Sequence, residues 1–203
     1  MTIEQIRVGA DNFSYLIYDK KGGIGALVDP GFDADRALGR IEELGLDLKF
    51  VIATHYHGDH VHDVPEVVRR TGARTVWSSA GVVSGFGRAD VDVKDGGGLS
   101  VGHLGLKFLE TPGHTPDSIC IVVDDQYLLT GDTIFIGDCG RCDLPGGSFK
   151  DMFNSIRRIK ELDDDLIIYP GHDYGPVPFR RLGEEKKKSR VMLAKDLEGF
   201  SRV

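Results

Sequence analysis

Four short apolar segments of this 203-residue chain each end a few residues before a histidine or an aspartate. Apolar runs of this length, bounded by turn residues, are typical of buried strands. The segments are residues 51–54 before His55, 107–110 before His114, 128–131 before Asp132, and 167–171 before His172. Because rigid strands fix the loops at their ends, residues distant in sequence can meet there. The pattern predicts a sheet protein with a polar site at one sheet edge.

The remaining segments fit two packed sheets with helices on their outer faces. Strands are expected at residues 3–8, 13–18, 24–28, 50–53, 74–77, 127–130 and 166–169, with several more between 91 and 123. Apolar residues recur at helical spacing over residues 33–44, 61–70 and the segment after Ser148, which is expected to be the N-cap of its helix. The strand pattern restarts after about residue 90. We predict one domain over residues 1–203, with 178–203 as a short helical C-terminal tail.

Charge and composition limit the kinds of partner. The formal net charge is −7, from 25 Lys and Arg against 32 Asp and Glu, which argues against binding nucleic acid or an anionic membrane. No apolar stretch approaches the roughly 18 residues that span a bilayer, and the N-terminus lacks a signal-peptide pattern. We expect a cytoplasmic protein with small-molecule partners, either a monomer or a homodimer.

The segment 54–60 concentrates potential metal ligands. In extended backbone His55 and His57 point to the same side, and Gly58 allows a turn that presents Asp59 and His60 to an adjacent position. Imidazole and carboxylate suit Zn²⁺ and Fe²⁺, and two such ions about 3.5–4 Å apart can share a bridging carboxylate. Each histidine alone would more often be an ordinary surface or core residue, but five of the seven occupy these positions. The pattern favours two metals, with Asp132 as the bridge.

Three neighbouring residues have weaker assignments. His62 follows on the expected helix and is at most a neighbour of the ligands, while His103 is expected to face solvent. Asp29 ends a buried strand, and it is either a simple turn residue or a group that orients a ligand histidine.

The cysteines give only weak evidence for redox function. Cys139 and Cys142 form a C-x-x-C motif, but Gly, Asp and Pro surround it in an expected loop rather than a strand-to-helix turn, which disfavours a redox pair of the thioredoxin kind. Cys120 lies in an apolar run and is expected to be a small buried residue.

Together these residues resemble the metallo-β-lactamase superfamily, whose hallmark is H-x-H-x-D-H followed by separate His, Asp and His ligands. The resemblance covers residues 8–174, most of the chain. It implies an αββα four-layer sandwich of two mixed sheets with outer helices, an α/β fold. It also implies a ligand set for two metals: His55, His57 and His114 for the first, Asp59, His60 and His172 for the second, and Asp132 bridging.

Within the superfamily, residues 131–135, 139–141 and 171–174 resemble the glyoxalase II and persulfide dioxygenase branch, here in a short form. By this resemblance Arg141 and Tyr174 contact the thiol carrier of the substrate; otherwise they are a surface charge and a packing aromatic. Longer glyoxalase II enzymes have a C-terminal helical domain, for which this sequence has room for only one or two helices. The charged run 184–190 is expected to be a solvated helix face rather than an anion clamp.

The leading hypothesis is a thioesterase of the hydroxyacylglutathione hydrolase type, in which a metal-bound hydroxide attacks the thioester and Asp59 and Asp132 are the candidate catalytic carboxylates. Zn is favoured, with Fe or mixed Fe and Zn as alternatives. The first alternative is a persulfide dioxygenase with one Fe²⁺ held by His55, His114 and Asp132, since two His and one carboxylate leave open positions for oxygen. The second alternative is a non-catalytic metal-binding module. Metal identity, acyl group and thiol carrier stay open.

Overall fold

The computed structural model describes residues 2–80 and 87–202, and it arranges them in two six-stranded sheets. The first sheet has the order β1-β2-β3-β4-β5-β6 and the second the order β12-β11-β10-β9-β8-β7. The strands of the first sheet are β1 (Thr2–Val8), β2 (Asn12–Asp19), β3 (Ile24–Val28), β4 (Asp47–Ile52), β5 (Arg74–Ser78) and β6 (Val91–Val93). Those of the second are β7 (Gly98–Val101), β8 (Leu104–Glu110), β9 (Ile119–Val123), β10 (Tyr127–Gly131), β11 (Ile167–Pro170) and β12 (Arg180–Arg181).

Both sheets are mixed. In the first sheet β1, β2 and β3 pair antiparallel and β3 to β6 pair parallel. In the second sheet β7 to β10 pair antiparallel, β10 and β11 pair parallel, and β12 returns antiparallel to β11.

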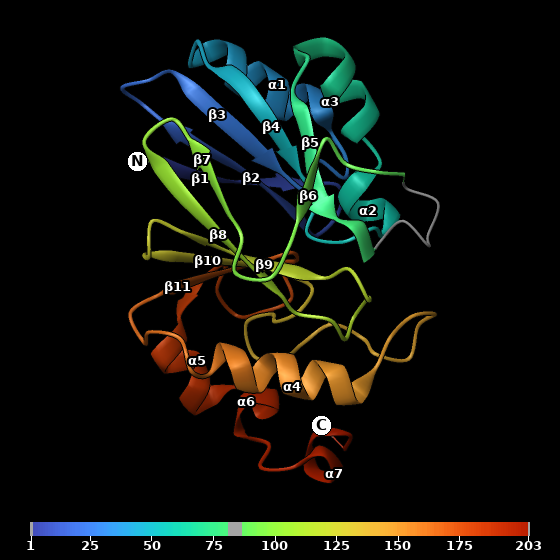
Figure 1. The fold of residues 1–203 in the computed structure, drawn as a ribbon. Helices are drawn as coiled ribbons and strands as arrows, with labels where there is room; N and C mark the ends of the chain where they lie inside the picture. Colours follow the sequence, from blue (N-terminus) through green and yellow to red (C-terminus); the bar gives the residue numbers. More distant parts are fainter. Residues whose placement is uncertain (1, 81–86, 203) are drawn as a thin grey trace.

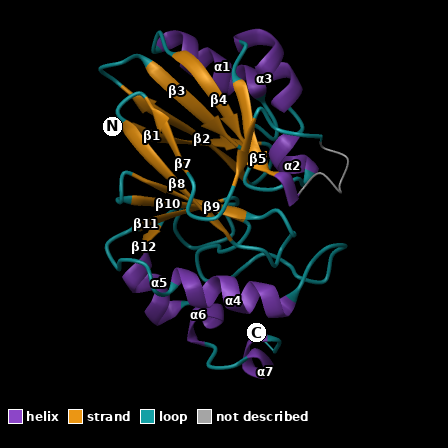
Figure 2. Ribbon diagram, viewed as in Figure 1, coloured by secondary structure: helices purple, strands orange, loops and turns teal. Residues whose placement is uncertain are grey.

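Helices cover the outer face of each sheet, giving the predicted αββα layers (Figures 1 and 2). The helices beside the first sheet are α1 (Ala34–Glu43), α2 (Gly58–Val61) and α3 (Val64–Thr71). Those beside the second are α4 (Phe149–Ile159), α5 (Leu182–Lys188), α6 (Arg190–Leu193) and α7 (Leu197–Phe200). None of the helices in the described ranges is both long and apolar enough to cross a bilayer.

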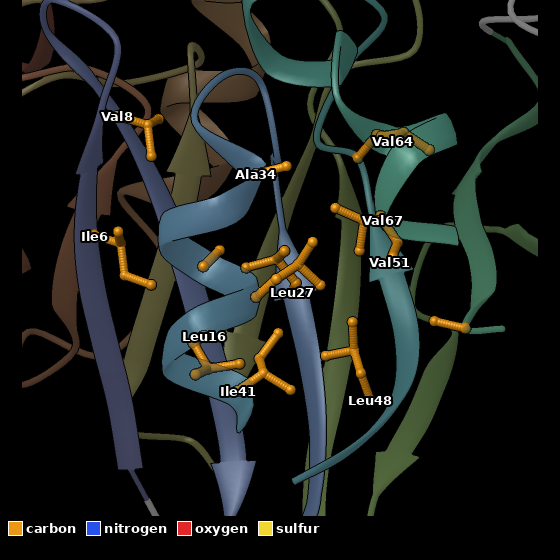
Figure 3. Close-up of a cluster of buried hydrophobic side chains, with 14 of the residues drawn as sticks. Ile6, Val8, Leu16, Leu27, Ala34, Ile41, Leu48, Val51, Val64 and Val67 are labelled. Atoms are coloured by element: carbon orange, nitrogen blue, oxygen red, sulfur yellow. The ribbon is translucent and has the colours of Figure 1, made fainter. Parts of the chain in front are cut away.

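Three layers of apolar side chains hold the sandwich together. Leu16, Leu27 and Ile41 belong to the cluster between the first sheet and its helices (Figure 3). A second cluster fills the space between the sheets, where Ile17 and Ile121 are fully buried. The third packs α4 and the C-terminal helices on the second sheet. Both β2 and β9 are buried along their whole length; β9 is apolar throughout, whereas β2 also carries Asn12, Ser14 and Asp19.

Most expected elements are present, and three differ. The helix expected at 61–70 is two helices, α2 and α3, and Pro65 lies in the first turn of α3, where its missing N–H is not needed. The strand expected at 50–53 begins earlier, at Asp47. The tail expected to be helical begins with strand β12 before its three short helices. Ser148 caps α4 as predicted, because its hydroxyl accepts a hydrogen bond from the backbone N–H of Asp151.

Candidate metal centre

The first group of possible ligands is three histidines from two sheets. His55 and His57 follow β4 of the first sheet, and His114 follows β8 of the second, and one ring nitrogen of each lies within 4.8 Å of the others. Nδ1 of His57 is 2.8 Å from Nε2 of His114. Their nitrogen lone pairs therefore converge on one point, as three imidazole ligands of a metal do.

The second group lies beside the first and contains Asp59, His60 and His172. Asp59 and His60 lie in α2, and His172 follows β11. Nε2 of His60 is 3.2 Å from Nε2 of His172, which in turn is 3.4 Å from Oδ2 of Asp59. Two nitrogens and one carboxylate oxygen face a common point here as well.

Asp132 lies between the two groups. Its Oδ1 is 3.3 Å from Nε2 of His60, and its Oδ2 is 3.3 Å from Nε2 of His172 and 3.5 Å from Nε2 of His114. Within the described residues, Asp132 Oδ1 and His55 Nε2 are buried without a hydrogen-bond partner. Buried polar atoms normally have hydrogen-bond partners. These two atoms are therefore expected to bind metal ions. The donor set fits two ions of the Zn²⁺ or Fe²⁺ kind.

Hydrogen bonds behind the site fix which nitrogen of each histidine points inward. His60 Nδ1 pairs with Asp29 Oδ2 at 3.1 Å, and His114 Nδ1 donates to the carbonyl of Arg141 at 2.7 Å. The corresponding partners are Asp11 Oδ1 for His172 and Thr54 Oγ1 for His55. These outer contacts leave Nε2 of all four rings for a metal, and such partners typically fix the tautomer of ligand histidines.

Asp29 has the orienting role that the sequence left open. It is 2% exposed at the end of β3, in left-handed backbone with φ 50°, which Asp tolerates better than most residues. Its carboxylate accepts from the backbone N–H and the hydroxyl of Thr54, both at 2.7 Å, and also contacts His60. One carboxylate therefore links the segment that carries His55 to the ring of His60.

Position 171, directly before His172, has room only for a glycine. A Cβ on Gly171 would lie 2.3 Å from Oδ1 of Asp132 and 2.9 Å from Cε1 of His60. The backbone that carries His172 can thus pass directly beside both ligands.

Burial and neighbouring charges shift the pKa values of the candidate ligands, in different directions for different residues. Burial, reinforced by the neighbouring histidines, lowers the pKa of His55 well below its ordinary value. Burial acts in the same direction on His60, but Asp132 and Asp29 outweigh it and raise the pKa of His60. Although burial opposes it, the surrounding histidines hold the pKa of Asp132 well below its usual range. Protons on these histidines would have to leave when metals bind.

A cavity of about 360 Å³ opens onto the two groups, and both predicted substrate contacts line it. Tyr174 stacks on His172, with ring centroids 4.6 Å apart, and meets Phe135 edge-on. Arg141 also lines the cavity, as does Leu144 three residues further along the chain. Seven of the nine predicted site residues therefore line one cavity, and the other two, His55 and His60, are buried beside them.

Two polar residues of the site were not predicted. Asn12 donates through its side-chain amide to Oδ2 of Asp59 at 3.0 Å, and Asp11 pairs with His172 as described. Asp11 immediately precedes β2 and Asn12 begins it, and nothing in the sequence marks such a polar pair after a turn as part of a site. His62 and His103 are surface residues as expected, with side chains 68% and 82% exposed.

Residues 8–172 match the family model of the metallo-beta-lactamase superfamily. The chain is 32% identical to the probable polyketide biosynthesis zinc-dependent hydrolase BaeB of Bacillus velezensis, over 93% of this chain and 85% of BaeB. It is 37% identical to a hydroxyacylglutathione hydrolase of Rhodopseudomonas palustris, over 81% of this chain but only 63% of that enzyme. The hydroxyacylglutathione hydrolase GloC of Haemophilus influenzae is 32% identical over 96% of this chain and 100% of GloC.

Among solved structures, ETHE1 from Myxococcus xanthus superposes with a TM-score of 0.90 and 33% identity, covering 98% of this chain and 88% of ETHE1. The αββα layers and the two clusters of histidine and carboxylate define a metallohydrolase-type fold and site. The chain belongs to the metallo-beta-lactamase superfamily, in the branch that contains the hydroxyacylglutathione hydrolases and ETHE1.

Proposed function

We propose that this protein is a two-metal hydrolase that cleaves thioesters of a small, carboxylate-bearing thiol such as glutathione. The observation that carries the proposal is the complete second ligand group. Asp59, His60 and His172 converge beside the first three histidines, with Asp132 between the groups. A binding module would need only one such group.

When bound, two divalent ions would supply Lewis acidity for the thioester carbonyl and would lower the pKa of water at the site to about 7. The chain supplies the fixed ligands. Neighbouring His172 and His60, together with the amide of Asn12, outweigh burial and lower the pKa of Asp59, so this carboxylate stays ionised. Asp132 is ionised for the same kind of reason and is proposed to bridge the ions.

Substrate binding is assigned to the cavity wall. Arg141 offers a planar guanidinium that can grip a carboxylate of the thiol carrier at two points. Tyr174, 57% exposed and stacked on His172, offers an aromatic face and a hydroxyl at the rim. No acid needs to protonate the departing sulfur, because a thiol with a pKa of about 8.5 leaves as the thiolate.

The similarity of whole chains supports this substrate class. GloC, which the chain matches along its full length, is named a hydroxyacylglutathione hydrolase, so an extra C-terminal domain is not needed by every enzyme of that name. A cytoplasmic location, a monomer or homodimer, and the absence of nucleic-acid or membrane partners stay predictions from the sequence.

Persulfide dioxygenation is the second candidate, because the ETHE1 structure superposes with a TM-score of 0.90. In that case one iron would be held by His55, His114 and Asp132, and the second group would not need to be filled. The non-catalytic module has no comparable support.

Assays under argon and in air separate the two candidates. Protein reconstituted with Zn²⁺ or Fe²⁺ is offered S-lactoylglutathione under argon, and glutathione persulfide in an oxygen-electrode cell. We expect thioester cleavage without oxygen. His60→Ala should abolish it, whereas His62→Ala, which alters an exposed histidine two residues away, should not. Oxygen uptake with the persulfide, together with an intact thioester, would replace the hydrolase with the dioxygenase.

A further inference from the structure

Two thiols that the proposed reaction does not use lie on the loop directly behind the metal centre. Cys139 is partly buried, Cys142 is 6% exposed, and both are free. The thiol of Cys142 donates to the carbonyl of Gly140 at 3.5 Å, and Cys139 packs against the apolar cluster that contains Cys142. The C-x-x-C spacing thus places both thiols on one short loop segment beside the same cluster, although the motif does not begin a helix as it does in thioredoxin-like proteins.

The two residues between the cysteines are held against metal ligands by their backbone. The N–H of Gly140 donates to the carbonyl of Asp132 at 2.9 Å, and the carbonyl of Arg141 accepts from Nδ1 of His114 at 2.7 Å. The fit is close, since a Cβ on Gly140 would lie 2.2 Å from that Asp132 oxygen and 2.9 Å from Nδ1 of His114. Movement of residues 140 and 141 would therefore shift both a ligand of the first group and the central carboxylate.

We propose that Cys139 and Cys142 form a reversible disulfide, and that its formation weakens metal binding by displacing the Gly140 and Arg141 backbone behind His114 and Asp132. A disulfide fixes its two sulfur atoms about 2.0 Å apart and constrains the dihedral angle between them. Closing this bond therefore imposes a new constraint on the backbone of residues 139–142. Changes in the hydrogen-bond partners of ligand histidines typically alter metal affinity by about 10- to 100-fold.

The oxidant is a peroxide. One thiolate attacks a peroxide oxygen, the O–O bond breaks, and the departing hydroxide takes up a proton to become water, which leaves a sulfenic acid on that cysteine. The second thiol then attacks the sulfenic sulfur, forming the S–S bond and releasing a second water. Two electrons pass from the cysteines to the peroxide. A dithiol reductant returns both thiols by exchange.

Cys120 provides an internal comparison. It is fully buried in β9, its sulfur contacts Thr111 and Thr130, and burial raises the pKa of its thiol to about 11. A buried thiol that is so hard to ionise should resist the same oxidant.

The test uses the full chain loaded with Zn²⁺, which peroxide cannot oxidise. Reduced protein is treated with hydrogen peroxide, desalted, and measured for free thiols in denaturant, for the linked peptide by mass spectrometry, and for Zn²⁺ affinity against a chromogenic chelator. We expect the thiol count to fall from three to one, a disulfide joining residues 139 and 142, and at least tenfold weaker binding of Zn²⁺. Dithiothreitol should reverse all three changes.

The controls are Cys120→Ser, which should respond like the wild type, and Cys139→Ser/Cys142→Ser, which should keep its Zn²⁺ affinity in peroxide. If the double variant does not fold, Cys139→Ser alone serves, since a single thiol cannot close this bond. Three thiols remaining after treatment, a disulfide with unchanged Zn²⁺ affinity, or equal loss of Zn²⁺ from the serine variant would each overturn the proposal. None of these measurements uses a substrate, so they stand apart from the thioesterase assay.

Discussion

Arg141 meets the cavity with its guanidinium already paired. Its Nε and Nη2 donate to the two carboxylate oxygens of Asp143 at 2.9 and 2.8 Å. The side chains are 68% and 56% exposed, so the pair adds little to the free energy of folding. A carboxylate of an incoming thiol carrier, however, would have to displace Asp143.

Asp143→Asn should therefore lower KM for a carboxylate-bearing thioester. Releasing an exposed ion pair is worth about 0.2–1 kcal/mol, which corresponds to a decrease of up to about fivefold, with kcat nearly unchanged. Arg141→Ala should raise KM instead. Steady-state kinetics of the double variant provide the control: if Asp143→Asn still lowers KM without Arg141, Asp143 acts on the substrate directly and not through the arginine.

The buried carboxyl of Asp117 lowers the free energy of unfolding by an amount that depends on pH. It is 4% exposed, its Oδ1 has no hydrogen-bond partner in the described part of the chain, and burial raises the pKa of its carboxyl to about 6. The folded chain then binds more protons than the unfolded chain between about pH 4 and 6. Ionised Asp117 therefore lowers the free energy of unfolding as the pH rises through this range, and the full cost remains above it.

Asp117→Asn removes this ionisation with little change in size. The variant should be more stable than the wild type, and its advantage should be about 1 kcal/mol larger at pH 8 than at pH 5. Urea unfolding of both proteins at the two pH values measures the difference. An advantage that did not change with pH would mean that Asp117 is already ionised at pH 5.

The candidate ligands could be singled out from the sequence as a set, because their residue types and their clustering in residues 54–60 and at strand ends are local features. Their outer partners could not. Asn12 contacts Asp59 from 47 positions away, and Asp11 contacts His172 from 161 positions away. Only the folded arrangement of the sheets brings such pairs together, and polar turn residues are too common to single out.

Among the elements, α5 departs most from its expected character. The charged run 184–190 was expected to be solvated, but Glu185 is fully buried. Its Oε2 accepts from Arg180 at 2.8 Å, and its Oε1 accepts from the backbone N–H of Gly137 at 2.6 Å. Charge alone could not reveal this, since the buried position depends on β12 pairing with β11 and placing Arg180 beside the helix.

Glu185→Gln should destabilise the protein by about 3 kcal/mol, because Arg180, only 13% exposed, would lose its counter-charge. Glu184→Gln is the matched control on the same helix. Glu184 is 53% exposed and pairs with Lys188 one turn away, so its loss should cost less than about 0.5 kcal/mol. Chemical unfolding of the two variants decides, and equal effects would mean that the buried pair contributes no more than a surface pair.

At the scale of the whole molecule, the two sheets meet at the metal centre. The backbone N–H of Phe13 donates to Gly171 across the sheets at 2.8 Å, and that of Ile119 donates to Thr54 at 2.9 Å. Each ligand group takes residues from both sheets. The order of the layers could be predicted from the pattern of strands and helices in the sequence. The hydrogen bonds between the sheets could be identified only in the folded structure. Metal binding should accordingly stabilise the sandwich as a unit.

The central claim is that hydrolysis needs both metal positions. Metal-free protein, prepared with a chelator, can be titrated with Zn²⁺ while the initial rate of S-lactoylglutathione cleavage is followed under argon. We expect the rate to rise until two equivalents per chain are bound and then to level off, with Asp59→Ala levelling at a small fraction of that rate. Full activity at one equivalent, or no cleavage at any metal content, would contradict the account.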